Sequence, residues 1–146
     1  MYMQNKEIEK CIERGKIVKL EDAKTLIPKE LEIALEDLTS SKNSFLNNNY
    51  KWSTVQSYYS MFHTARALLY NKDYREKSHY CLIEAIRSFY VEEELLSFEF
   101  IEALQLGRTL RENADYYSDF NKESSEEIMN MADKFLLEAK EVLKIN

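Results

Sequence analysis

Hydrophobic residues recur at helical spacing through most of this chain. The clearest stripe lies in residues 52–70, where apolar positions cover much of the helical circumference. These positions are Val55, Tyr58, Tyr59, Phe62, Ala65, Leu68 and Leu69. A helix that is apolar over so much of its surface is buried on more than one side. We therefore expect this helix at the centre of a bundle.

Similar periodicity predicts four further core helices, in the regions 28–46, 79–90, 98–114 and 125–143. Pro28 suits the first turn of its helix, where the missing N–H costs nothing. Serine residues are the expected N-caps of the last three helices, namely Ser78, Ser97 and Ser124. Gly107 falls inside a predicted helix and indicates a close approach to a neighbouring helix, because glycine is otherwise unfavourable there.

The N-terminal segment adds one short helix over residues 5–14, followed by Gly15 and a mixed connector over residues 17–25. The chain has only two Gly and one Pro, whereas sheet proteins need many tight turns. We predict an all-α fold: an antiparallel up-and-down bundle of four to five core helices with a short extra N-terminal helix. The expected organisation is an extension over residues 1–28 and one helical domain over residues 29–146.

The net charge of −6 argues against a protein that coats nucleic acid through a broad basic surface. No apolar run is long enough for a membrane span, and the polar N-terminus is unlike a signal peptide. Cys11 and Cys81 lie far apart, without a CxxC motif, and are interpreted as reduced thiols of a cytoplasmic protein. We expect no metal and no cofactor.

Two clusters could bind an anion. Tyr59, His63 and Arg66 share one side of the central helix, where a His and an Arg could hold a phosphate and move a proton. The alternative is a polar seam between helices or a subunit contact. Lys77 and His79, with Arg75, precede a helix N-terminus that favours anions. The alternative there is an exposed charged loop.

A third cluster lies near the end of the helix over residues 98–114. Arg108, Arg111 and Asp115 are spaced three and four apart and so share one helical face. Arg111 and Asp115 could form a simple structural ion pair. Alternatively, the two arginines form a phosphate clamp, for which guanidinium geometry is well suited.

Three segments resemble the HEPN domain (higher eukaryotes and prokaryotes nucleotide-binding), and in particular its small single-domain prokaryotic members. Residues 58–69 resemble the central-helix motif, Ser78-His79 the start of the next helix, and residues 110–116 the Arg-x-x-Ala-Asp-Tyr segment. With the helix order, the resemblance covers about residues 31–143. It implies a helical bundle that usually forms a homodimer. It also implies pairing with a minimal nucleotidyltransferase in a toxin–antitoxin or stress-response couple.

Many HEPN proteins are metal-independent RNases whose signature places a His a few residues after an Arg. Arg111 matches that Arg, but Asp115 and Tyr116 occupy the region of the His, and no His follows His79. His63 precedes Arg66, so that pair has the wrong order.

Three hypotheses follow. The first is a HEPN-type module that binds a nucleotide or RNA phosphate through Arg111, helped by Arg108, Arg66 or His63, and acts with a nucleotidyltransferase. The second is a metal-independent endoribonuclease in which Arg111 works with His63 or His79. The third is a purely structural, dimerising bundle.

Overall fold

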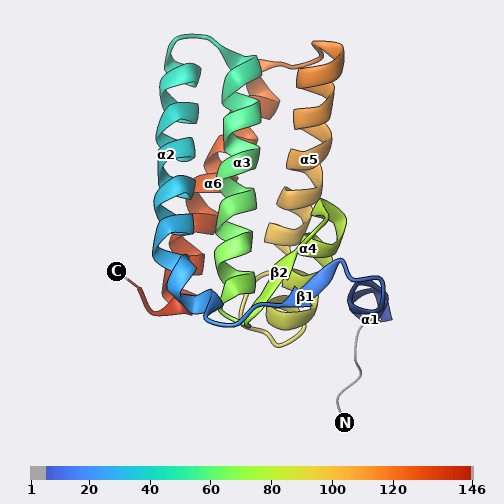
Figure 1. Cartoon of the computed structure of the whole chain (residues 1–146). Coiled ribbons are helices and arrows are strands. Elements are labelled where there is room, and N and C mark those ends of the chain that lie inside the picture. The colour runs from blue at the N-terminus through green and yellow to red at the C-terminus, as the bar shows by residue number, and fades with distance from the viewer. Residues whose placement is uncertain (1–5, 146) are drawn as a thin grey trace.

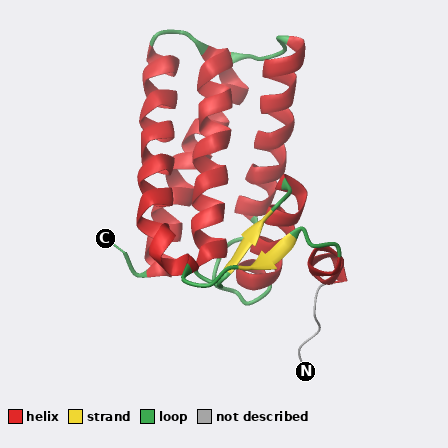
Figure 2. Ribbon diagram, viewed as in Figure 1, coloured by secondary structure: helices red, strands yellow, loops and turns green. Residues whose placement is uncertain are grey.

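The computed structural model describes residues 6–145 and shows an all-α bundle with a small two-stranded sheet at one end (Figure 2). The α-helices are α1 (Lys6–Glu13), α2 (Ile27–Leu46), α3 (Tyr50–Tyr70), α4 (His79–Ile86), α5 (Glu99–Tyr117) and α6 (Lys122–Leu143). A 3-10 turn, η1 (Ala23–Leu26), precedes α2, and a π-helical turn, η2 (Arg87–Val91), follows α4. The predicted fold class is confirmed.

Helix α3 is the central element, as the apolar stripe predicts. It lies between α2 and α5, with α6 behind it (Figure 1). Its buried side chains include Tyr58, Met61 and Leu68, at 0–1% exposure. Burial on several sides explains why its polar residues are mainly Ser and Thr, whose hydroxyls can bond to backbone carbonyls. Thr64, for example, donates to the carbonyl of Ser60 at 2.9 Å.

The connector before α2 is more ordered than expected. Strand β1 (Ile17–Lys19) pairs antiparallel with β2 (Tyr74–Glu76), with Val18 opposite Arg75. Short strands of this kind leave little periodic signal, because three residues cannot establish an alternating pattern. The pairing places the N-terminal segment beside the turn that leads from α3 to α4.

Cys11 on α1 and Cys81 on α4 form a disulfide, so the expectation of two reduced thiols is wrong. Packing of α1 against α4 brings their Cα atoms to 5.7 Å, within the range that a disulfide spans. The two residues are 70 positions apart, and nothing in the sequence indicates that their helices meet. The expectation of a cytoplasmic protein rested in part on two free thiols, and the disulfide removes that argument.

The helix caps follow the sequence only in part. Pro28 lies in the first turn of α2, and the Ser78 hydroxyl accepts from the backbone N–H of Cys81, both as predicted. The prediction for Ser124 is wrong, because α6 begins earlier and Asn121 caps it instead. Helix α5 begins at Glu99 rather than directly after Ser97. None of the helices in residues 6–145 is both long and apolar enough to cross a membrane.

Candidate functional site

Tyr58 on α3 contacts both His79 and Arg111. Its hydroxyl lies 2.6 Å from His79 Nδ1, and the two rings are nearly parallel at 14°. Phe62, one turn along α3, stacks on the His79 ring with centroids 4.5 Å apart. The Arg111 guanidinium carbon lies 5.7 Å from the Tyr58 ring centroid. We call these four residues and Arg108 the Arg–His cluster.

Three helices build this cluster, and a local feature positions two of them, α4 and α5. His79 is the first residue of α4, and the Ser78 cap fixes the start of that helix. Gly107 lets α5 approach α3, since a Cβ there would lie 2.6 Å from Met61 Cε and 3.2 Å from Tyr58 Cδ1. The close approach predicted for Gly107 is therefore confirmed. It brings the following turns of α5, with Arg108 and Arg111, beside Tyr58.

Burial and charge set the protonation of the His79–Tyr58 pair. Burial raises the pKa of Tyr58 to about 12, so its phenol keeps the proton at neutral pH. The pKa of His79 is lowered, first by burial and then by the positive charges of Arg108 and Arg111. A neutral imidazole beside two guanidinium groups has a nitrogen free to accept a proton only in the tautomer in which Nδ1–H donates to the Tyr58 hydroxyl oxygen and Nε2 carries no proton.

Arg111 lies among aromatic rings instead of carboxylates. Its guanidinium carbon is 5.7 Å from the centroids of Tyr58 and Tyr59 and 5.9 Å from that of Tyr116. Within residues 6–145 it forms no ion pair, and its buried Nε has no hydrogen-bond partner. Ring faces attract a cation but do not neutralise it. Arg111 therefore has no carboxylate counter-ion within residues 6–145, and its buried Nε is a donor that no described acceptor satisfies.

Within residues 6–145, Arg111 and Asp115 do not form the simple ion pair that their spacing allows. Asp115 is exposed, and Arg108 instead pairs with Glu112 one turn further along, at 3.4 Å. Both partners of that pair remain about 40% exposed, at 39% and 43%. Such a pair is weak enough for Arg108 to turn toward a stronger anion.

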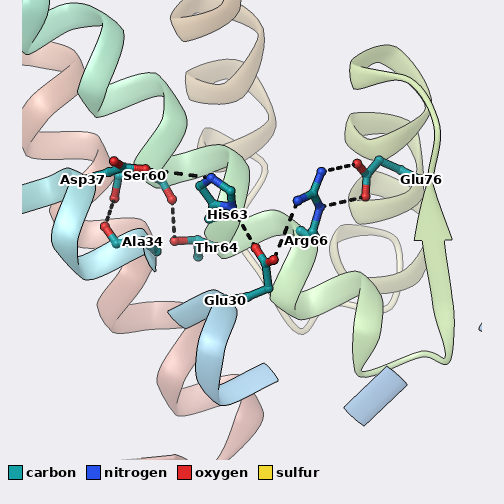
Figure 3. A network of polar contacts seen from close by, with 8 residues as sticks. All are labelled: Glu30, Ala34, Asp37, Ser60, His63, Thr64, Arg66 and Glu76. Atoms are coloured by element: carbon teal, nitrogen blue, oxygen red, sulfur yellow. Dashed lines mark hydrogen bonds and ion pairs between the residues drawn. The ribbon is translucent and has the colours of Figure 1, made fainter. Parts of the chain in front are cut away.

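The structure places His63 and Arg66 in a network of carboxylates that adjoins the Arg–His cluster at Phe62 (Figure 3). His63 Nδ1 lies 2.7 Å from Glu30, and Nε2 lies 3.8 Å from Asp37. Arg66 binds Glu76 through two contacts of 3.1 and 2.7 Å and lies 3.6 Å from Glu30. These contacts agree with the polar seam between helices, the alternative considered for this cluster.

Burial acts to lower the pKa of Arg66, but Glu76 and Glu30 outweigh it and the pKa is raised. The guanidinium is thus held charged inside a nearly buried pair, since the Glu76 side chain is 7% exposed. A phosphate would have to displace this bidentate carboxylate. Of the cations predicted to bind phosphate, Arg66 is the most fully satisfied by protein groups.

The structure brings neither Lys77 nor Arg75 into contact with the Arg–His cluster; Arg75 lines a different cavity, beside Arg66 and Tyr70. The side chains of Lys77 and Arg75 are exposed, and the Lys77 backbone N–H donates to the carbonyl of Lys16 at 2.8 Å. Next to His79, Tyr80 and Arg108 line a cavity of about 280 Å³ between α4 and α5. This cavity exposes Arg108 to solvent, but Glu84 and Glu112 line it as well.

Sequence reasoning missed Tyr58 and Phe62 as functional residues. Both lie on the apolar stripe of α3 and were assigned to the core, where they are indeed buried at 1% and 6% exposure. Two signals were available: residues 58–69 resemble the central-helix motif of HEPN domains, and a buried tyrosine usually has a hydrogen-bond partner for its hydroxyl. Periodicity could not identify His79 as that partner, because α4 follows a turn and a strand.

Comparison with known proteins agrees with this fold. The HEPN domain family matches residues 28–142, which is most of the chain, and the chain therefore belongs to the HEPN family. Two relatives come from the archaeon Methanocaldococcus jannaschii. "Putative toxin MJ0605" is 32% identical over 115 residues, which cover 78% of this chain and 86% of the relative. "Putative toxin MJ0142" is 28% identical over 132 residues, or 89% of each chain.

Proposed function

We propose that this HEPN protein is the toxin-like component of a two-protein couple and binds the phosphate of a nucleotide or RNA at the Arg–His cluster. Arg111 is the principal residue that binds the phosphate, and Arg108, one turn earlier on α5, contributes a second guanidinium group. His79 and Tyr58 form the floor of the site. Lys77 adds positive potential at the rim. This proposal leaves His63 and Arg66 out of the phosphate-binding residues, because both already have carboxylate partners.

The observation that carries this proposal is Arg111 itself. Its guanidinium contacts three tyrosine rings, and its buried Nε lacks a hydrogen-bond acceptor in the described chain. A buried donor without a partner costs roughly 1–3 kcal/mol. A phosphate oxygen would satisfy that donor and offset the positive charge. The two M. jannaschii relatives, whose names both begin "Putative toxin", support the toxin-like role in this proposal.

The test uses His79 as an internal reporter. Inorganic phosphate is titrated while NMR follows the His79 imidazole signals, and the titration is repeated with short RNA oligonucleotides. A bound anion offsets the two arginine charges, so the pKa of His79 should rise on binding. Arg111→Gln should weaken binding about tenfold or more. The exposed Arg14→Gln is the matched control and should change little.

Binding that is equal in wild type and Arg111→Gln would refute Arg111 as the ligand. Binding that leaves the His79 signals unchanged would place the anion elsewhere on the protein. Arg66→Gln, by contrast, should leave phosphate binding intact if the protein remains folded.

A second candidate function, metal-independent RNA cleavage, is favoured by the contact of Tyr58 with both His79 and Arg111. In that reaction neutral His79 accepts the proton of a 2′-hydroxyl. The freed oxygen attacks the adjacent phosphorus, and the 5′-oxygen leaves with a proton from solvent. The products are a 2′,3′-cyclic phosphate and a 5′-hydroxyl.

RNA incubated in EDTA with wild type, Arg111→Gln and His79→Asn separates the two functions. Cleavage that both substitutions abolish would support the nuclease. Binding without cleavage would leave the protein as a phosphate-binding module.

The proposed partner is a minimal nucleotidyltransferase, and the proposed assembly is a homodimer. Both rest on what resemblance to the HEPN family implies, and the printed names of the two relatives bear only on a toxin-like role. Co-purification with the product of a neighbouring nucleotidyltransferase gene tests the first, and light scattering of the isolated protein tests the second. A monomer at micromolar concentration would argue against the dimer.

A further inference from the structure

A groove of about 620 Å³ runs between α5 and α6. Its apolar surface comes from both helices. Ala103 and Leu106 contribute from α5, and Ile128 and Met131 contribute from α6. Ile128 and Ala103 are buried, whereas Leu106 is 39% exposed and so presents an apolar side chain to solvent.

Carboxylates line both edges of this groove. Glu102 lies on the α5 side and Glu127 on the α6 side, and both residues are exposed. Neither forms an ion pair with any residue in the range 6–145. At one end of the groove Glu99 pairs with Lys134 at 2.9 Å, which leaves the negative charge concentrated along the middle.

We propose that this groove binds a basic amphipathic helix of a partner protein. An apolar surface with an unpaired carboxylate on each edge complements a helix with an apolar stripe flanked by Lys or Arg. The α5 edge of the groove, from Glu99 to Thr109, measures about 15 Å along the helix axis, which matches roughly three turns of a bound helix.

The groove and the cavity beside Arg108 share a wall. Gln105 and Thr109 line both this groove and the cavity that contains Arg108. A helix in the groove would therefore lie next to the entrance to Arg108. Docking does not depend on phosphate binding, but a docked partner would hinder the approach of a large anion such as RNA.

The test uses a fluorescent synthetic peptide of roughly four helical turns, with leucine at core spacing and lysine on both flanks. Its affinity is measured by fluorescence anisotropy. Glu102→Lys with Glu127→Lys should weaken binding about tenfold or more, because like charges would then face each other. The matched control is Glu36→Lys with Glu141→Lys, which changes the net charge equally at two exposed positions outside the groove. A scrambled peptide of the same composition should bind weakly.

Hydrogen exchange locates the bound peptide. Protection confined to residues 99–109 and 127–131 supports the groove. Equal loss of affinity in both charge-reversed variants, equal binding of the scrambled peptide, or protection elsewhere would overturn the proposal. So would light scattering that shows a second copy of the chain covering this groove. Arg111→Gln should leave peptide affinity unchanged, so failure of this proposal is distinguishable from failure of the phosphate site.

Discussion

Replacement of Arg66 by Met separates a structural arginine from a ligand-binding one. In wild type the Arg66 guanidinium binds both oxygens of Glu76, at 3.1 and 2.7 Å, and approaches Glu30 at 3.6 Å. Met preserves most of the side-chain length and its contact with Phe62, but it removes the charge. Glu76, with a side chain 7% exposed, then loses its cation inside the protein.

The magnitude follows from burial. Removing one partner of a fully buried ion pair costs about 3–5 kcal/mol, mostly because the other charge remains buried. Arg66 is 25% exposed, so water can reach part of the vacated position. We therefore expect a loss of about 2–3 kcal/mol in the free energy of unfolding. The double variant Arg66→Met, Glu76→Met removes both charges. Its free energy of unfolding should lie only about 1 kcal/mol below that of wild type.

Urea unfolding followed by the fluorescence of Trp52 and by circular dichroism measures these differences. If the free energy of unfolding falls by about 2 kcal/mol per M of urea, the unfolding midpoint of Arg66→Met should be lower than that of wild type by about 1–1.5 M. Lys42→Met is the control, because it breaks an exposed ion pair with Asp133 and should cost less than about 1 kcal/mol. An Arg66→Met midpoint equal to that of wild type, or a double variant less stable than the single, would refute the reasoning.

Three further results are expected. Arg108→Gln should raise the pKa of His79 toward its ordinary value, as NMR titration would show, because the Arg108 charge helps to lower it. The pKa of His79 is lower in the folded state than in the unfolded state. The neutral ring therefore contributes fully to stability above about pH 6.5, and this contribution is lost as the pH falls through the folded-state pKa. In His79→Asn, the free energy of unfolding should depend less on pH below about pH 6.5. Replacing Cys11 and Cys81 by Ala should cost about 3–4 kcal/mol in thermal unfolding, since their disulfide closes a long loop, and an unchanged stability would show that the cross-link contributes nothing.

The sequence predicts the long helices of this fold well, because each carries its own periodic signal. The central position of α3 follows directly from a stripe too wide for one interface. Contacts between distant segments carry no such signal. Cys11 meets Cys81 only because α1 packs against α4, and the paired strands β1 and β2 are separated in the sequence by α2 and α3. The α6 cap was misplaced for a different reason, since Asn121 and Ser124 both suit an N-cap and only the first is used.

The candidate site shows the same limit more sharply. Spacing alone predicts that Arg108 and Arg111 share one helical face. It does not predict that Arg111 lacks a carboxylate partner and contacts tyrosine rings instead. The i,i+4 rule favours Asp115 as that partner, yet the Arg111 guanidinium lies over the tyrosines of α3, toward the bundle. His79 joins the same cluster through Tyr58, a residue that periodicity assigns to the core. A His after the Arg in the sequence is therefore not the only way for this fold to place an imidazole near that Arg, which is why RNA cleavage in EDTA remains the experiment to perform.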